Sequence, residues 1–124
     1  MKVVYLAGPY RADTEYEVHR NIQAAEVVAL EVWKLGAVCI CPHKNTAYFG
    51  GALPADVWLK GSLELVRRSD AVLLMHDWCK SQGARAERTF ATSAGIALPV
   101  FHSLGALGDW LADAARREKT WSQA

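Results

Sequence analysis

Short apolar runs alternate with longer amphipathic stretches along the chain. Four of the apolar runs have the length and the flanking turn residues of buried strands, and they lie at residues 2–7, 37–41, 70–75 and 98–101. Apolar residues recur at helical spacing in the stretches between and after them, at about residues 14–36, 54–68, 81–94 and 107–114. This alternation predicts an α/β fold: a doubly wound, Rossmann-like parallel sheet of about four to five strands with helices on both faces.

Residues at the element boundaries support this division. Thr14 and Glu17 form a capping box ahead of the first helix, and Gly36 is placed to end that helix. The segment from Pro42 to Leu53 is polar and contains glycine, which predicts a loop longer than the few residues usual between such elements. Long loops of this kind often carry function.

The chain is expected to form one domain over residues 1–124, because no repeat, linker or low-complexity segment divides it. The last predicted helix is followed by a polar tail at residues 116–124, which we expect to fray. Met1 leads directly into a strand, so no signal peptide is expected, and no apolar run approaches the roughly 20 residues of a membrane span.

Charge and cysteine content narrow the classes of partner. The 14 Lys and Arg side chains nearly balance the 13 Asp and Glu side chains, which leaves a net charge of +1. A chain with so small a net charge has no electrostatic field strong enough to bind a nucleic-acid polymer or an anionic membrane. The odd number of cysteines, 3 in total, favours reduced thiols in the cytoplasm over a secreted disulfide framework.

The loop after the first strand, Gly8-Pro9-Tyr10-Arg11, is a candidate ligand loop, because open parallel sheets bind ligands beyond the carboxyl ends of their strands. It has neither the three glycines of a dinucleotide fingerprint nor the lysine of a P-loop, which disfavours nucleoside triphosphate chemistry. Gly8 allows close backbone approach, and Arg11 places a forked cation where a phosphate or a base carbonyl could be bound. The alternative is a turn glycine and a solvated arginine.

The start of the helix at residues 81–94 carries the most informative pattern. Ser81 is a predicted N-cap, and Gly83 leaves room for a ligand beside the free N–H groups of the first turn, which form a ready anion site. Glu87 follows one to two turns later, where the helix dipole would keep its carboxylate ionised as a nucleophile. The alternative is a surface glutamate paired with Arg85 or Arg88.

Three further residues have both a functional and a structural interpretation. Tyr5 lies inside the first strand, where a buried hydroxyl needs a partner such as Glu87, or it is an ordinary core tyrosine. Asp70 opens the third strand, where acidic residues are depleted, so it serves either as a cap or in a site. Trp78 either stacks on a base or closes the core.

Three potential metal ligands lie around the end of the second strand. Cys39, Cys41 and His43 alternate along one face, but a fourth ligand is not evident, so no metal and no cofactor is expected. His43, Asn45 and Thr46 are expected instead to offer neutral hydrogen bonds to a sugar or a base.

Three motifs occur in order at strand ends: Tyr5-Leu6-Ala7-Gly8-Pro9-Tyr10-Arg11, Ser69-Asp70-Ala71-Val72 and Ser81-Gln82-Gly83-Ala84-Arg85-Ala86-Glu87. Together they resemble the nucleoside 2-deoxyribosyltransferase superfamily, which includes 2'-deoxynucleoside 5'-monophosphate N-hydrolases. The resemblance covers roughly residues 3–101.

The resemblance implies roles for the matching residues. Glu87 matches the glutamate nucleophile, Tyr5 the tyrosine that orients it, and Asp70 the acid near the leaving base. Gly8 and Arg11 match the first ligand-binding loop. The position of Ser81 is an aspartate in the transferases and a phosphate-binding serine in the N-hydrolases, so it favours a monophosphate substrate.

The implied activity is cleavage of the base–sugar bond through a covalent glycosyl-glutamate intermediate. Two alternatives remain open: a 2-deoxyribosyltransferase that acts on free nucleosides, and a non-catalytic nucleotide-binding sensor on the same scaffold. The resemblance also implies a homodimer or higher homo-oligomer, in which a neighbour helps to close the site.

Overall fold

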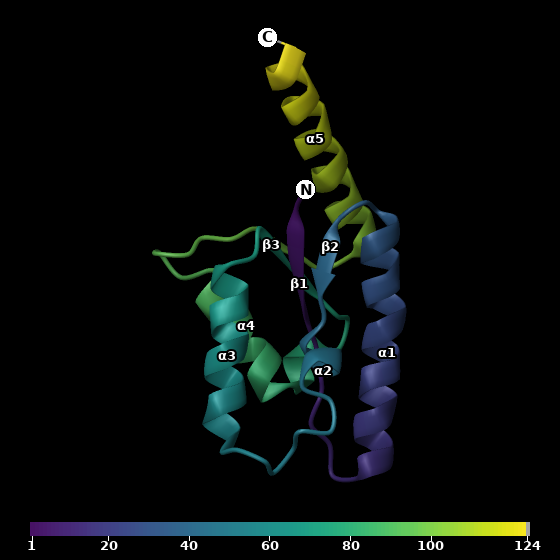
Figure 1. Ribbon diagram of the computed structural model, residues 1–124, viewed down its shortest axis with the longest axis vertical. Coiled ribbons are helices and arrows are strands. Elements are labelled where there is room, and N and C mark those ends of the chain that lie inside the picture. Colours follow the sequence, from purple (N-terminus) through teal and green to yellow (C-terminus); the bar gives the residue numbers. More distant parts are fainter. Residues whose placement is uncertain (124) are drawn as a thin grey trace.

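The computed structural model describes residues 1–123, with side chains to residue 119, and it contains one parallel four-stranded sheet (Figure 1). The strands are β1 (Val3–Ala7), β2 (Val38–Ile40), β3 (Ala71–Leu74) and β4 (Val100–Phe101), in the spatial order β2-β1-β3-β4. The helical elements are α1 (Glu15–Lys34), α2 (Pro42–Asn45), α3 (Ala55–Arg67), the 3-10 turn η1 (Trp78–Lys80), α4 (Gln82–Ala91) and α5 (Leu104–Gln123). This confirms the predicted doubly wound α/β fold, with four strands.

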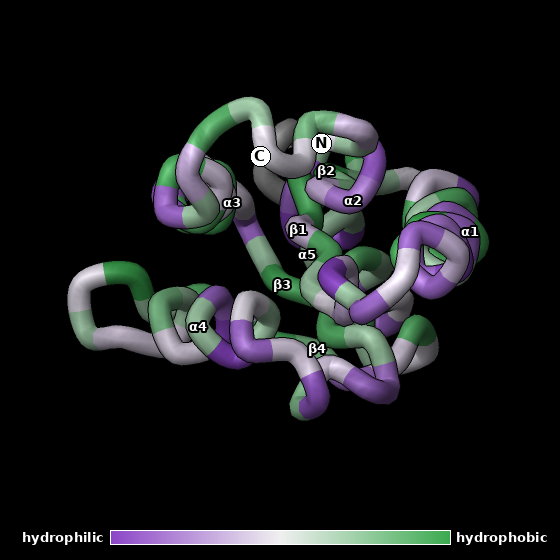
Figure 2. Tube along the Cα trace, turned by 90° about the horizontal axis from the view of Figure 1, so that it is seen from below, coloured by the Kyte–Doolittle hydropathy of each residue, from purple (hydrophilic) through white to green (hydrophobic). Residues whose placement is uncertain are grey.

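The helices cover both faces of the sheet, with α3 and α4 on one side and α1 on the other (Figure 2). Alternate residues of β1 serve the two layers because successive side chains of a strand point to opposite faces. Val4 and Leu6 pack with α1 and with Leu107 of α5. Tyr5 and Ala7 pack with α3 and α4. Burial on both faces explains why the strands are continuously apolar in sequence.

The two central strands, β1 and β3, lie at the switch point of the sheet. The chain leaves β1 for α1 on one face and leaves β3 for α4 on the other, which is where open α/β sheets hold ligands. Gly8, directly after β1, packs against Met75, directly after β3. A Cβ added at Gly8 would meet the Met75 side chain, with Cγ at 2.8 Å and Cβ at 3.0 Å, so a larger residue there would require Met75 to shift.

The predicted caps are present at three helix ends. Thr14 Oγ1 accepts a hydrogen bond from the Glu17 N–H at 3.1 Å at the start of α1, and Gly36 follows the end of α1 with φ +89°. Ser81 Oγ accepts from the Ala84 N–H at 3.1 Å at the start of α4.

Two segments differ from the sequence-based expectation. Residues 42–45 form the short helix α2 within the predicted long loop, because Pro42 at the first helical position fixes a suitable φ. Helix α5 extends to Gln123, so the segment from Arg116 that was expected to fray is helical as far as the structure describes it. Residues 112–119 consist mainly of Ala, Arg, Glu and Lys, which are strong helix formers. Ala124 lies outside the described residues.

In the part of the chain that is described, none of the helices combines the length and the hydropathy that crossing a membrane requires.

Candidate functional site

A buried hydrogen bond joins β1 to α4. The Tyr5 hydroxyl donates to Oε2 of Glu87. The Tyr5 side chain is fully buried, and Glu87 is only 7% exposed. The contact expected from the sequence between these two side chains is therefore present. The alternative of a surface glutamate paired with Arg85 or Arg88 is wrong, because Glu87 faces inward.

The apolar stripe of α4 explains this orientation. Ala84, Glu87 and Ala91 are the buried residues of the helix, and their spacing of three and four places them on one face. Glu87 thus occupies a position at which the amphipathic pattern calls for an apolar side chain. A carboxyl group buried at such a position requires a polar partner, and Tyr5 provides one.

Burial controls the ionisation of this pair. It raises the pKa of Glu87 to about 7, and the hydrogen bond from Tyr5 offsets only part of the rise. Burial, reinforced by the neighbouring Glu87, also raises the pKa of Tyr5 above its ordinary value, so this side chain remains a neutral phenol and a donor. Burial therefore opposes the stabilisation of the ionised carboxylate that was expected from the helix dipole, which acts mainly on the first turn.

Ser62 of α3 completes the cluster and was missed in the sequence. Its half-buried side chain lies near enough to the Tyr5 phenol to lower the pKa of that group, against the larger rise that burial causes. Ser62 is half-buried and precedes the fully buried Val66 by four residues, so it lies on the inward stripe of α3. The sequence signal that could have identified Ser62 is a polar residue at an inward-facing position of a helix.

His43 anchors the first loop. Its Nε2–H donates to the Pro9 carbonyl oxygen at 2.9 Å, and the Tyr10 ring approaches the imidazole edge-on with centroids 5.9 Å apart. Burial lowers the pKa of His43, so the ring is neutral and has a single N–H. This N–H is therefore engaged within the chain, and His43 is only 2% exposed, so nothing in this contact supports the expected hydrogen bond from His43 to a sugar or a base.

The candidate metal residues are arranged for packing. Nδ1 of His43 lies 3.9 Å from Sγ of Cys41, and Cys39 is part of the core cluster beneath α1. Burial raises the pKa of both thiols. Within the described residues, no three His, Cys, Asp or Glu side chains converge in a way that could hold a metal ion.

The start of α4 remains open for a ligand. A Cβ added at Gly83 would have Ser81 Oγ as its nearest neighbour at 3.9 Å, which leaves space beside the first turn. The first turn of α4 carries no acidic residue. The first loop contributes Pro9 and Tyr10, which are half-buried, and Arg11, which is exposed.

Trp78 packs against the core cluster on the α3 and α4 side of the sheet. The Arg88 guanidinium lies over its ring, 5.5 Å from the centroid, and His102 approaches it at 6.1 Å with the rings inclined by 63°. The tryptophan thus closes the core, the structural alternative considered for it, and Arg88 occupies one face of the ring.

Asp70 lies at the other end of the sheet. Its Oδ2 accepts from the Val3 N–H at 2.7 Å, and its own N–H donates to the Val3 carbonyl at 2.8 Å. These contacts join the amino ends of β1 and β3, and the whole of β3 separates them from the loop before α4. The expected role of Asp70 beside a leaving base is therefore not supported, and the capping alternative describes it.

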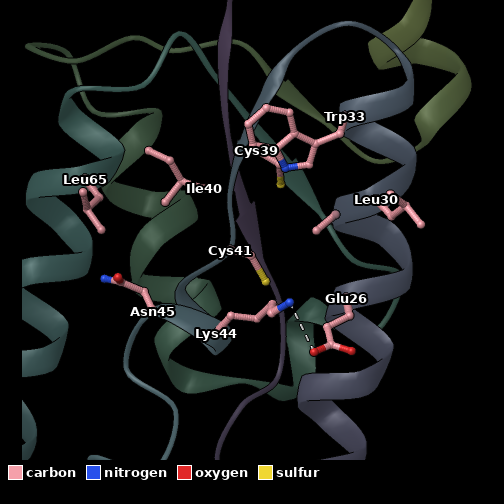
Figure 3. Close-up of a pocket in the computed structure, with 10 residues that line it drawn as sticks. Glu26, Leu30, Trp33, Cys39, Ile40, Cys41, Lys44, Asn45 and Leu65 are labelled. Carbon is pink, nitrogen blue, oxygen red and sulfur yellow. Dashed lines mark ion pairs between the residues drawn. The ribbon is translucent and has the colours of Figure 1, made fainter.

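A groove with a volume of about 600 Å³ lies along β2, between α1 and α3 (Figure 3). Lys44 and Glu26 form an ion pair at 3.4 Å across one part of it. Asn45, expected to bind substrate, is exposed and lines this groove, which Glu87 does not line. The structure thus brings Tyr5 and Glu87 together but places Asn45 along the edge strand.

Comparison with known proteins supports the fold assignment. A family model described as a domain of unknown function (DUF4406) matches residues 2–100. A solved structure of 2-deoxyribosyltransferase from the psychrotolerant bacterium Bacillus psychrosaccharolyticus superposes with a TM-score of 0.53 over 86% of this chain and 90% of that one, at 13% sequence identity. No curated protein matches. The resemblance expected from the sequence is thus confirmed at the level of the fold, and the chain belongs to the DUF4406 family.

Proposed function

We propose that this protein cleaves the N-glycosidic bond of a nucleoside 5'-monophosphate, with Glu87 as the nucleophile. The buried hydrogen bond between Tyr5 and Glu87 carries the proposal. A carboxyl group withdrawn from water and held by a neutral phenol is costly for folding, and arrangements of this kind are concentrated at functional sites.

The pair has the groups needed for a displacement at C1' of the sugar. A Glu87 oxygen forms a bond to C1' while the bond from C1' to the base nitrogen breaks, and the base leaves with that electron pair and takes a proton from solvent. Water then hydrolyses the glycosyl ester, which releases the sugar phosphate and restores the carboxylate. Tyr5 holds one carboxylate oxygen, so the other is left to attack.

The start of α4 supports a phosphorylated substrate. The first turn carries free backbone N–H groups and no acidic side chain, which is the arrangement that favours an anion. Ser81 Oγ already accepts from the Ala84 N–H, but its own hydrogen can still be donated to a phosphate oxygen. Glu87, less than two turns away on the same helix, would then lie near the sugar.

A 2-deoxyribosyltransferase activity on free nucleosides is the second candidate. The fold shared with a solved 2-deoxyribosyltransferase favours it. Both activities use the same glycosyl-enzyme and differ in whether water or a second base attacks it. A nucleotide sensor without catalysis would bind the same ligand but release no base.

One incubation separates these three functions. The protein is mixed with a deoxynucleoside monophosphate, the matching nucleoside and a different free base, and the products are resolved by chromatography. Free base and sugar phosphate support the proposal, whereas a new nucleoside indicates the transferase. Ligand binding by calorimetry with neither product indicates a sensor.

The proposal includes assembly of identical chains in the cytoplasm. Val27, Leu30 and Trp33 are 67%, 56% and 52% exposed along α1 at a spacing of three residues, an apolar stripe that a second copy would cover. The ion pair between Lys44 and Glu26 beside the stripe offers both signs of charge, which suits pairing of like surfaces across a twofold axis. Light scattering would measure the mass of the assembly.

The proposed location in the cytoplasm rests on the thiols. Free Cys39, Cys41 and Cys79 are compatible with a reducing compartment.

A further inference from the structure

The segment between α2 and α3, residues 46–54, lies at the ligand end of the sheet. β2 runs parallel to β1, and the chain returns to the start of β3 through α3, so this segment is on the same side as the loop after β1. Figure 1 shows it crossing that end of the molecule, where the segment from β1 to α1 also runs. The bond from His43 Nε2 to the Pro9 carbonyl, 2.9 Å long, ties α2 to the first loop just before the segment begins.

Two hydrogen-bonded turns follow each other within this segment. The Phe49 N–H donates to the Thr46 carbonyl at 3.1 Å, and the Ala52 N–H donates to the Phe49 carbonyl at 3.0 Å. The third residue of the second turn is Gly51, with φ +82°, and glycine is the residue type expected at such a left-handed position. The third residue of the first turn is Tyr48, with φ +68°. A left-handed turn position is thus built once with glycine and once with tyrosine.

Tyrosine at this position is costly, and its side chain buries little. A left-handed φ brings the Cβ of an L-residue close to the following carbonyl oxygen, a contact that glycine avoids. Tyr48 is 86% exposed, so packing within the described chain does not offset that cost. Backbone outliers of this kind are concentrated at functional sites. The exposed ring is therefore free to make a contact outside the chain.

Neighbouring residues hold the first turn at both ends. Thr46 Oγ1 donates to the Pro42 carbonyl of α2 at 3.4 Å. Phe49 packs against Trp58 of α3, with ring centroids 5.9 Å apart and planes inclined by 38°. Tyr48 lies between these two anchors in the sequence. Because the turn is already held, little backbone freedom is lost when a ligand packs on the ring.

We propose that Tyr48 binds the nucleobase of the substrate by stacking its ring on the face of the base. The inference rests on the proposed function for the identity of the ligand and deepens it. Glu87 is proposed to act at the sugar and the start of α4 at the phosphate, and Tyr48 supplies a contact for the base. Every nucleobase has an aromatic face, so such a contact adds affinity without choosing strongly between bases.

Calorimetric titration in the Glu87→Gln background, in which the ligand should not be consumed, tests this contact. The probes are the 2'-deoxynucleoside 5'-monophosphates of the common bases, together with 2-deoxyribose 5-phosphate, which has the sugar and the phosphate but no base. Tyr48→Ala should weaken binding of the monophosphates by at least about fivefold, the smallest effect usual for removal of a stacking partner. Binding of 2-deoxyribose 5-phosphate should not change. Tyr48→Phe keeps the ring and should bind like the background protein.

Tyr48→Gly separates the ring from the backbone. It removes the ring and also relieves the left-handed φ, so it should lose affinity for the monophosphates as Tyr48→Ala does. Tyr16→Ala is the matched control, since Tyr16 is 67% exposed in the first turn of α1 and its hydroxyl accepts from Arg20. This control should leave every titration unchanged.

Monophosphate binding that is unchanged in Tyr48→Ala, or recovered in Tyr48→Gly, overturns the inference and leaves the proposed function standing. An equal loss of binding for 2-deoxyribose 5-phosphate overturns it as well, because the ring would then not act on the base. If binding follows the expected pattern but the unmodified protein releases no base, the contact with Tyr48 stands and the proposed cleavage fails. If none of the monophosphates binds, both fail.

Discussion

The hydroxyl of Tyr5, in a central strand, donates its hydrogen to the carboxylate of Glu87, a residue 82 positions later in the chain. The strand supplies a rigid platform for the phenol, and the buried face of α4 delivers the carboxylate to it. The position of the pair on the α3 and α4 side of the switch point is therefore a result of the fold itself.

Glu87→Ala should abolish base release and leave monophosphate binding measurable. The carboxylate is needed where positive charge develops at C1', whereas ground-state affinity comes from the start of α4 and the first loop, and losing a nucleophile typically costs several orders of magnitude in rate. Chromatography of released base and calorimetry of ligand binding measure the two effects. Glu64→Ala is the control, because Glu64 is a solvent-exposed glutamate that pairs with Arg67 and Arg68. A Glu87→Ala variant that keeps most of its activity would refute the mechanism.

The turnover rate should rise with pH through about 7, because the nucleophile must be ionised and burial raises the pKa of Glu87 to about 7. A pH–rate profile would measure this rise.

The stability of the folded protein should fall over the same pH range. Glu87 in the folded protein retains a proton that the unfolded chain loses near the ordinary pKa of 4.5. Stability contributed by protonated Glu87 is therefore complete below about 4.5 and is lost as the pH rises to about 7. Glu87→Gln should remove this loss and stabilise the protein at pH 8, by about 3 kcal/mol at most. Denaturant unfolding at pH 5 and pH 8 would measure it, and equal pH dependence in both proteins would contradict it.

Ser81→Asp should weaken binding of the monophosphate by at least about tenfold and change binding of the nucleoside little. Aspartate caps a helix as well as serine does, so α4 keeps its start while a negative charge appears where the phosphate is proposed to lie. Calorimetric titration with both ligands gives the comparison. Ser81→Ala serves as the control that removes the cap without adding charge. If both ligands weakened equally in Ser81→Asp, the phosphate would have to lie elsewhere.

Asp70→Ala should destabilise the protein while the folded fraction keeps its turnover. The Val3 N–H would lose a partly buried charged acceptor, which typically costs about 1–3 kcal/mol. The free energy of unfolding and the rate per folded molecule measure the two effects. A large fall in rate without loss of stability would return Asp70 to the site, the role that the resemblance implied.

The sheet and its helices were predictable because burial on both faces leaves a strong apolar signal in each strand. α2 was missed because a single turn that begins at Pro42 contains too few residues for helical periodicity to show. The length of α5 was underestimated because the second half of the helix has high helix propensity without an apolar stripe. Propensity and periodicity are separate signals, and the tail carried only the first.

The candidate site was predictable in part. Tyr5 and Glu87 were paired correctly because a hydroxyl inside a buried strand needs a partner, and the resemblance assigned the same two residues to one site. Asp70 was misplaced although it precedes its strand, which puts it at the amino ends of a parallel sheet, away from the ligand loops. Ser62 was not predicted because serine is common on helix surfaces, and the tyrosine near it lies on a strand far away in the sequence.

The contact between Gly8 and Met75 sets a limit on redesign of the first loop. Any side chain at position 8 would press against the side chain of Met75, whose N–H is bonded to the Ala7 carbonyl at 2.9 Å, so Met75 would have to shift at the junction of the two strands. A library built to alter substrate preference should hold residue 8 constant and vary residues 9–11, of which 9 and 10 are half-buried and 11 is exposed. Variation for new specificity therefore begins at Pro9.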